Sequence, residues 1–321
     1  MPRAQEDSRP PRGKGARFLA LCAALAALGL VFAFAIRPWY LAWGATAAET
    51  VMPLPGDDIV AGVAEQETRA ITIHAPAHEV WPWLAQLGQN RGGFYSYDML
   101  ENVVGCEMPT ADVLRPDKQS WAVGDKLWMY PFTKAGGAGY ATLRVFVPGR
   151  ALGFGTHVAG TPPTAPEDGS WSFALESSTD STTRLLVRGR GAPGHSLLGV
   201  AFDRSIFEPM HFAMEKRMLI GIRQLSEGRS RERVSNHVQV VLWVLTFGMF
   251  VAGIESVFRR VAWKRALTGT VAAAIVFQVL TLGQPTLDVG VLLVLIVATL
   301  LWWPIEPGSP LSVILERGRA A

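Results

Sequence analysis

Four long apolar runs and one mixed central region divide the chain. Apolar side chains fill residues 18–36, 238–254, 267–282 and 287–303 with few interruptions. A helix needs about 20 apolar residues to cross the hydrocarbon core of a bilayer. We therefore predict four transmembrane α-helices, at 17–36, 238–258, 265–283 and 286–303, of which the last two are short for that task.

The central region opens with a strand followed by a helix. Ile71 and Ile73 alternate with polar neighbours, which is the period of a half-buried strand. Apolar residues then recur at helical spacing from Val80 to Leu87, and Pro82 interrupts that helix. This change of period marks the start of a soluble domain, which we place at 67–228.

Several short strands and one long helix complete the domain. Turn signals separate the predicted strands, which favours an antiparallel meander; these strands are expected at 126–130, 140–147, 151–157, 170–176 and 183–190. A helical stripe follows them, with Pro209 in its first turn. The stripe consists of Phe207, Met210, His211, Met214, Met218, Ile222 and Leu225.

The remaining segments connect or flank these elements. Residues 1–16 form a basic tail whose Arg, Pro and Gly content predicts disorder. We interpret 37–66 as a linker, 229–237 as a basic hinge and 304–321 as a tail. Residues 45–47 (ATA) resemble a signal-peptidase site. Because this site lies well beyond the first apolar run, we favour an uncleaved anchor.

Basic residues near the ends of the runs predict the orientation in a membrane. They precede the first run, occupy the loop at 259–265 and follow the fourth run. The positive-inside rule then places the N-terminus in the cytoplasm and the soluble domain outside, in an integral, multi-pass protein of the cell membrane. The basic segment 223–233 conflicts with this orientation, although long domains translocate largely regardless of charge. The alternative is a cytoplasmic domain whose first run is cleaved or not inserted.

Charge and cysteine content exclude several classes of protein. The net charge of +3 is small and dispersed, and no nucleic-acid-binding motif occurs, so we expect no nucleic-acid partner. The two cysteines, Cys22 and Cys106, are far apart, which argues against a disulfide framework. His74 and His78 have the spacing of metal ligands, but a strand end and a helix start separate them. We therefore expect no metal and no cofactor.

Three segments of the domain resemble a known superfamily. They are the strand leading into Ala75-Pro76 and Val80-Trp81, the loop RGGFYSYD at 91–98, and EPMHFAMEKRM at 208–218. Over 67–228 the chain resembles the SRPBCC superfamily, also called START or Bet v1-like, in its polyketide cyclase/dehydratase-type branch. The resemblance implies an α+β helix-grip fold, in which a curved antiparallel sheet surrounds a long C-terminal helix.

Polar and aromatic residues of these segments are the candidate site. If a cavity lies between sheet and helix, we expect it to be lined by Arg91, Tyr95, Trp128, Trp171, Phe173, Met210, His211 and Met214. The alternative for each is ordinary packing: a methionine stripe is commonly core, and Asp98 can cap its helix and pair with Arg91.

Three hypotheses for function follow. The first is a membrane-anchored domain that binds a hydrophobic small molecule or lipid. The second is an enzyme like the cyclases and dehydratases of the superfamily, in which His211, Asp98 or Tyr95 moves protons. The third is a membrane-tethered sensor or interaction module. No paired acid and base in the sequence compels the enzyme, so binding is the preferred interpretation.

Overall fold

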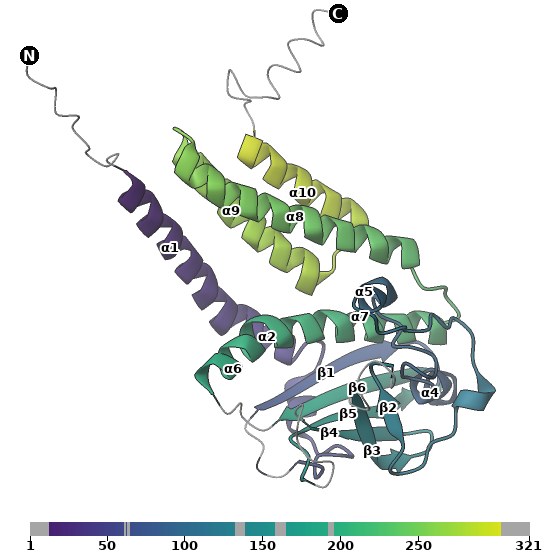
Figure 1. Cartoon of the computed structure of the whole chain (residues 1–321). Coiled ribbons are helices and arrows are strands. Elements are labelled where there is room, and N and C mark those ends of the chain that lie inside the picture. Colours follow the sequence, from purple (N-terminus) through teal and green to yellow (C-terminus); the bar gives the residue numbers. More distant parts are fainter. Residues whose placement is uncertain are drawn as a thin grey trace, which may run out of the picture. The chain divides into compact units, whose positions relative to one another are not determined.

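The chain forms two units in the computed structural model (Figure 1), which describes residues 13–60, 62, 65–131, 139–157, 165–191 and 196–302. One unit is Ala35–Arg233, and the other combines Met1–Phe34 with Val234–Ala321. The first contains the sheet, and the second contains apolar helices. Each is described by itself below.

The sheet of unit Ala35–Arg233 is antiparallel, as predicted. Its six strands lie in the order β1-β6-β5-β4-β3-β2. Every pair in that order is antiparallel, which confirms the α+β class and the meander. The strands are β1 (Glu65–Ile73), β2 (Lys126–Trp128), β3 (Tyr140–Val147), β4 (Ala151–Thr156), β5 (Gly169–Thr179) and β6 (Thr182–Gly191). The turn predicted between the strands at 126–130 and 140–147 lies mostly outside the described residues.

One face of the sheet packs against two helices, α4 (Ala77–Ala85) and α7 (Glu208–Ser226) (Figure 1). Alternate residues of β1, β5 and β6 join the inner sides of both helices in one apolar core. Gly221 of α7 is required there, because an added Cβ would lie 2.4 Å from the backbone oxygen of Tyr95. The space between sheet and helix is therefore filled largely by side chains, such as those of Phe173, Met218 and Ile222.

Shorter helices connect these elements. They are α5 (Asp98–Val103), the 3₁₀ turn η2 (Pro116–Lys118), α6 (Leu197–Phe202) and the π-helical turn η3 (Asp203–Phe207). The last two run directly into α7, so residues 197–226 form one helix with a wider turn in it.

The segment predicted as a linker, 37–66, is instead packed on the sheet over much of its length. Its helices are α2 (Arg37–Leu41) and α3 (Ala47–Val51). Leu54 packs with Ala70, Ala174 and Leu186 on the face opposite the main core. Arg188 of β6 is 2 % exposed. It donates to the backbone oxygens of Glu49 and Met52 and to Oδ2 of Asp57. The prediction missed this role because a short Pro- and Gly-containing segment has no recognisable periodicity.

The second unit consists of apolar helices. They are α1 (Lys14–Val31), which continues through η1 (Phe32–Ile36), then α8 (Arg233–Arg259), α9 (Trp263–Gln278) with η4 (Val279–Gly283), and α10 (Leu287–Trp302). Among the described residues, three helices are long and apolar enough to cross a membrane: Lys14–Leu41, Arg233–Arg259 and Trp263–Gly283. The fourth predicted span is a shorter apolar helix of 16 residues, so three of the four predicted spans have the length and composition that crossing a membrane requires.

Candidate functional site

Four charged or ionisable side chains meet where α7 crosses the beginning of β1. Glu67 and Arg69 occupy alternate positions of β1, on the same face as the core residues Ile71 and Ile73. His211 lies near the start of α7. Glu215 follows it by four residues, which places both on one side of the helix.

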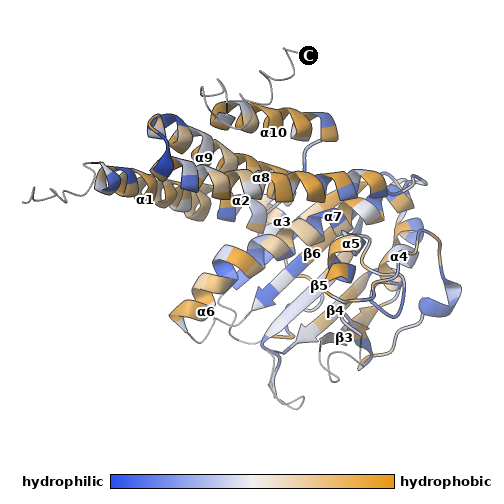
Figure 2. Ribbon diagram, turned by 45° about the horizontal axis from the view of Figure 1, so that its top comes forward, coloured by the Kyte–Doolittle hydropathy of each residue, from blue (hydrophilic) through white to orange (hydrophobic). Residues whose placement is uncertain are grey.

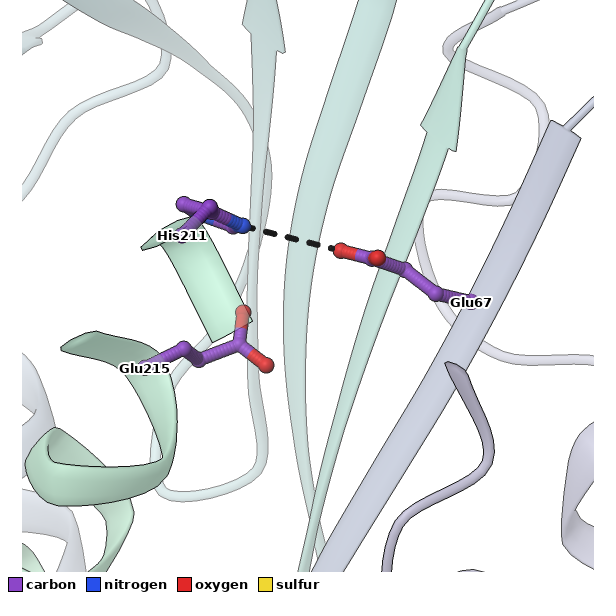
Figure 3. Close-up of side chains that lie close together, drawn as sticks. All are labelled: Glu67, His211 and Glu215. Carbon is purple, nitrogen blue, oxygen red and sulfur yellow. Dashed lines mark ion pairs between the residues drawn. The ribbon is translucent and has the colours of Figure 1, made fainter. Parts of the chain in front are cut away.

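These side chains form one network, of which Figure 3 draws Glu67, His211 and Glu215. Arg69 donates to Oε1 of Glu215 at 2.8 Å and to Oε2 of Glu67 at 2.5 Å. The indole N–H of Trp171 donates to Oε2 of Glu215 at 2.8 Å. Nδ1 of His211 lies 3.8 Å from Oε1 of Glu67. We call Glu67, Arg69, Trp171, His211 and Glu215 the charged cluster.

The inner part of the charged cluster is completely buried. The side chains of Arg69 and Glu215 are 0 % and 1 % exposed. Burial alone would raise the pKa of Glu215, but the positive charge of Arg69 and the neighbouring His211 outweigh it and lower that pKa. Arg69 also donates to the backbone oxygen of Tyr40 and lies over the ring of Phe212. Glu215 therefore remains a carboxylate inside the fold.

The outer part of the cluster, at His211, is partly exposed to solvent and contacts two aromatic rings. The side chain of His211 is 34 % exposed. The ring of Phe207 is parallel to its imidazole, with centroids 5.9 Å apart, and Trp171 approaches with centroids 5.8 Å apart. A polar, partly exposed group thus lies between two aromatic rings, with the Glu67 carboxylate beside it. This arrangement can orient a polar head group, and it can hold or move a proton at His211.

Three residues of the cluster are of the types that bind metal ions. Ligand atoms of Glu67, His211 and Glu215 all lie within 4.8 Å of one another, a spacing that one ion can bridge. However, Arg69 and Trp171 already donate to both oxygens of Glu215, and Arg69 donates to both oxygens of Glu67. A cation would have to displace the guanidinium from both carboxylates. The donor arrangement fits a balanced ion network better than a metal centre.

Three predicted site residues lie outside the charged cluster. Arg91 stacks 3.6 Å over the ring of Trp121 and donates to backbone oxygens. Tyr95 is buried, has a φ of 57°, and donates its hydroxyl to the backbone oxygen of Trp83. Asp98 pairs with Arg231 at 2.9 Å, and not with Arg91 as predicted. Each of the three has a structural partner that accounts for it.

Phe173, Met214 and Met210 divide between the core and the surface. Phe173 is fully buried in the main core, next to Trp171. Met214 lies beside Ser96, which donates to its backbone oxygen. Met210 is 56 % exposed. The expectation that Met210 faces the sheet is therefore wrong.

Trp128 also lies elsewhere than predicted. It stands on the face of β2 opposite the core residue Leu127, where it contacts Tyr140. Side chains alternate along a strand, so Trp128 cannot share the inner face with its neighbour Leu127. Of the predicted ligand-binding residues, the structure brings Trp171 and His211 together.

Glu67, Arg69 and Glu215 were not predicted as site residues, although the sequence pattern indicates where they lie. Glu67 and Arg69 continue the alternation of Ile71 and Ile73, so all four had to share one face of the strand. Glu215 stands one helical turn after His211. Charged residues at inward positions of a strand or a helix are rare unless they are paired. An inward arginine on the strand and an inward glutamate on the helix therefore indicate the pair Arg69–Glu215.

The two histidines with metal-like spacing line a different, open hollow of about 510 Å³. His74, His78, Glu79 and Trp83 contribute to it, together with residues of the last turn of α7. The backbone N–H of His74 donates to Glu227.

Comparisons with known proteins give similarity in structure alone. No family model matches the sequence, and no curated protein matches it. Several solved structures are similar at low identity. Protein MLL2253 from Mesorhizobium loti is 14 % identical with a TM-score of 0.29, and the match covers 50 % of this chain and 96 % of that one.

Two further structures carry polyketide-related descriptions. The di-domain ARO/CYC protein BexL of the BE-7585A biosynthetic pathway is 16 % identical with a TM-score of 0.27, over 51 % of this chain and 46 % of that one. The Polyketide_cyc-like protein Cgl2372 from Corynebacterium glutamicum is 15 % identical with a TM-score of 0.24, over 56 % and 93 %. At these scores the similarities carry no argument about activity, so the fold described above rests on its own sheet and helices.

Proposed function

We propose that this protein is a membrane-anchored ligand-binding protein of the SRPBCC helix-grip type. Its unit Ala35–Arg233 binds a hydrophobic small molecule or a lipid where α7 begins. The observation that carries this proposal is the setting of His211. A partly exposed imidazole lies between the rings of Phe207 and Trp171, with the carboxylate of Glu67 beside it. An amphiphile needs such a pairing of a polar contact with apolar surface.

The packed core changes where the ligand is expected. The sequence suggested a cavity between sheet and helix, but that space is occupied largely by core side chains. We therefore place the ligand at the end of the sheet where β1 begins, with its polar group near His211 and Glu67. Its apolar part lies along Phe207 and Met210, which are 50 % and 56 % exposed.

The membrane part of the proposal rests on the apolar helices. Three of them have the length and composition of membrane spans. We propose that the N-terminus is cytoplasmic and that unit Ala35–Arg233 lies outside, because basic residues concentrate before α1 and between α8 and α9. Reporter fusions at Pro55 and Gly283 test this orientation. A periplasmic-type signal at Pro55 supports it, and a cytoplasmic-type signal there contradicts it.

Photo-crosslinking tests the ligand site. A diazirine-labelled fatty acid is added to the full chain in lipid nanodiscs, irradiated, and its adducts are mapped by mass spectrometry of peptides. We expect adducts within 204–215, and we expect His211→Ala to reduce them several-fold. His78→Ala is the matched control, because His78 lies in the separate hollow beside α4. Adducts confined to the apolar helices, or unaffected by His211→Ala, would contradict the proposal.

A second candidate function is a proton-transferring enzyme, such as a cyclase or dehydratase. The observation that favours it is the 3.8 Å approach of Glu67 to Nδ1 of His211. A carboxylate on one ring nitrogen orients the imidazole and leaves the other nitrogen to act as a base. The pH dependence of turnover distinguishes this function from binding alone: Glu67→Gln must shift it, and an unchanged profile would exclude Glu67 from the reaction.

A further inference from the structure

The helix that precedes α7 carries an unusually exposed apolar surface. In α6 and η3, Leu197 and Leu198 are 91 % and 84 % exposed, and the side chains of Phe202 and Ile206 are more than half exposed. Figure 2 shows α6 mostly in the hydrophobic colours. Leu198, Phe202, Ile206 and Met210 recur every four residues and so lie on one side of the helix, and we call these four residues the apolar stripe.

The polar side of the same helix is fastened to the rest of the unit. Arg204 donates to Glu65, the first residue of β1, at 2.6 Å. Glu208 accepts from Arg37 at 2.9 Å. Residues two positions apart are about 200° apart around a helix, so Phe202 and Ile206 lie on the side opposite Arg204. The apolar stripe therefore faces away from the sheet to which the helix is bound.

The nearest neighbouring element indicates what covers the stripe. Helix α2 directly follows the apolar run 18–36 and belongs to the same unit as the sheet. Its Trp39 and Tyr40 contact Phe212 of α7 with ring centroids 5.7 and 5.2 Å apart. Trp39 is 45 % exposed and follows the apolar run, and a Trp at the end of a span marks the level of the membrane–water interface. The ion pair Arg37–Glu208 then holds the end of the apolar stripe close to that level.

From this geometry we propose that the apolar stripe inserts into the interfacial region of the membrane that α1 crosses. The occupant of the stripe is the lipid surface. An interfacial helix buries its apolar side about 5–10 Å into the boundary of head groups and acyl chains. The unit thus contacts the bilayer through α2 and through α6–η3. This contact brings the exposed part of His211 close to the lipid. This inference rests on the membrane anchoring proposed above.

Site-directed fluorescence measures the insertion directly. In a full chain with Cys22→Ser and Cys106→Ser, Leu198→Cys and Ile206→Cys are labelled separately with NBD and placed in nanodiscs of phosphatidylcholine and phosphatidylglycerol. Both positions are exposed, so neither substitution removes core packing. The control is Asp180→Cys in the turn between β5 and β6, which lies at the opposite end of the β1–β6 pair from Glu65 and Gly191.

At positions 198 and 206 we expect blue-shifted emission of the label. We also expect at least two-fold quenching there by lipids that carry a doxyl group near the head of the acyl chain. We expect neither effect at position 180. The insertion would be overturned if emission and quenching at 198 and 206 equal those of the control in chains that co-elute with the discs. The membrane anchoring would then still stand. Energy transfer between labels on two chains would overturn it in favour of a second copy. Failure to enter nanodiscs would overturn both proposals.

Discussion

Removing the guanidinium from the charged cluster is expected to destabilise the fold strongly. In Arg69→Met the carboxylate of Glu215, 1 % exposed, loses its ion pair and retains the indole N–H of Trp171. Breaking a buried ion pair by removing one partner costs about 3–5 kcal/mol. For a domain of this size, each kcal/mol lowers Tm by about 2–4 °C. The apparent Tm should therefore fall by about 6–20 °C.

The measurement is thermal unfolding of the full chain in detergent, followed by tryptophan fluorescence. Arg150→Met is the matched control, because it removes the same side chain from an exposed pair with Glu176. Exposed pairs contribute about 0–1 kcal/mol, so this variant should unfold close to the wild type. Arg69→Met together with Glu215→Met should recover part of the loss, since no buried charge remains unpaired at position 215.

The pH dependence provides an independent check on the same variant. Without Arg69, burial raises the pKa of Glu215 above its value in the unfolded chain, about 4.3. A group of this kind does not destabilise the fold below its unfolded pKa, and its destabilisation grows as pH rises from the unfolded pKa to the higher folded pKa. Arg69→Met should therefore be closer to the wild type at acidic pH than at pH 8. A loss below about 1 kcal/mol at pH 8, or additive effects in the double variant, would refute the account of the pair.

Three other predictions concern the same unit. Burial lowers the pKa of Lys216 to about 8, so the charged form is disfavoured in the fold and stability decreases as pH falls from the unfolded pKa, about 10.4, towards 8. Lys216→Met should raise Tm at pH 7 and flatten that dependence; a lower Tm would contradict this. Gly221→Ala should lower stability by about 1–3 kcal/mol because the new Cβ meets the oxygen of Tyr95, whereas Gly248→Ala, where nothing lies within 4 Å, should not. Hydrogen bonds from Arg184 lower the pKa of Glu49 to about 2, so its stabilisation is present above its unfolded pKa of about 4.5 and is lost as pH falls towards 2; an acid titration in which Glu49→Gln is no less pH-dependent than the wild type would disprove it.

The secondary structure could be predicted well because local patterns specify it. The predicted strand at 140–147 matches β3 (Tyr140–Val147), and the other strands end within a few residues of their predicted limits. The helix at 77–85 forms despite Pro82, whose neighbours Val80, Trp83 and Leu84 are buried in the core. Alternation and helical spacing require only neighbouring residues, so a single sequence contains them.

The candidate site was harder to predict because it depends on which faces meet. His211 and Trp171 were expected on inner surfaces, and the structure brings them together. The stripe of α7 was extended too far towards its start, where Met210 is exposed. Helical periodicity gives the direction of a face but not the point at which the partner sheet ends. The pairing of Arg69 with Glu215 spans 146 positions, and no local pattern contains it.

Native mass spectrometry of the full chain released from nanodiscs tests the central claim most directly. The wild type and the variant Phe207→Ala with His211→Ala differ only at the proposed site, so lipids held by the apolar helices are common to both. The account predicts that the wild type retains one more non-covalently bound apolar molecule than the variant. Equal retention by the two chains would contradict it.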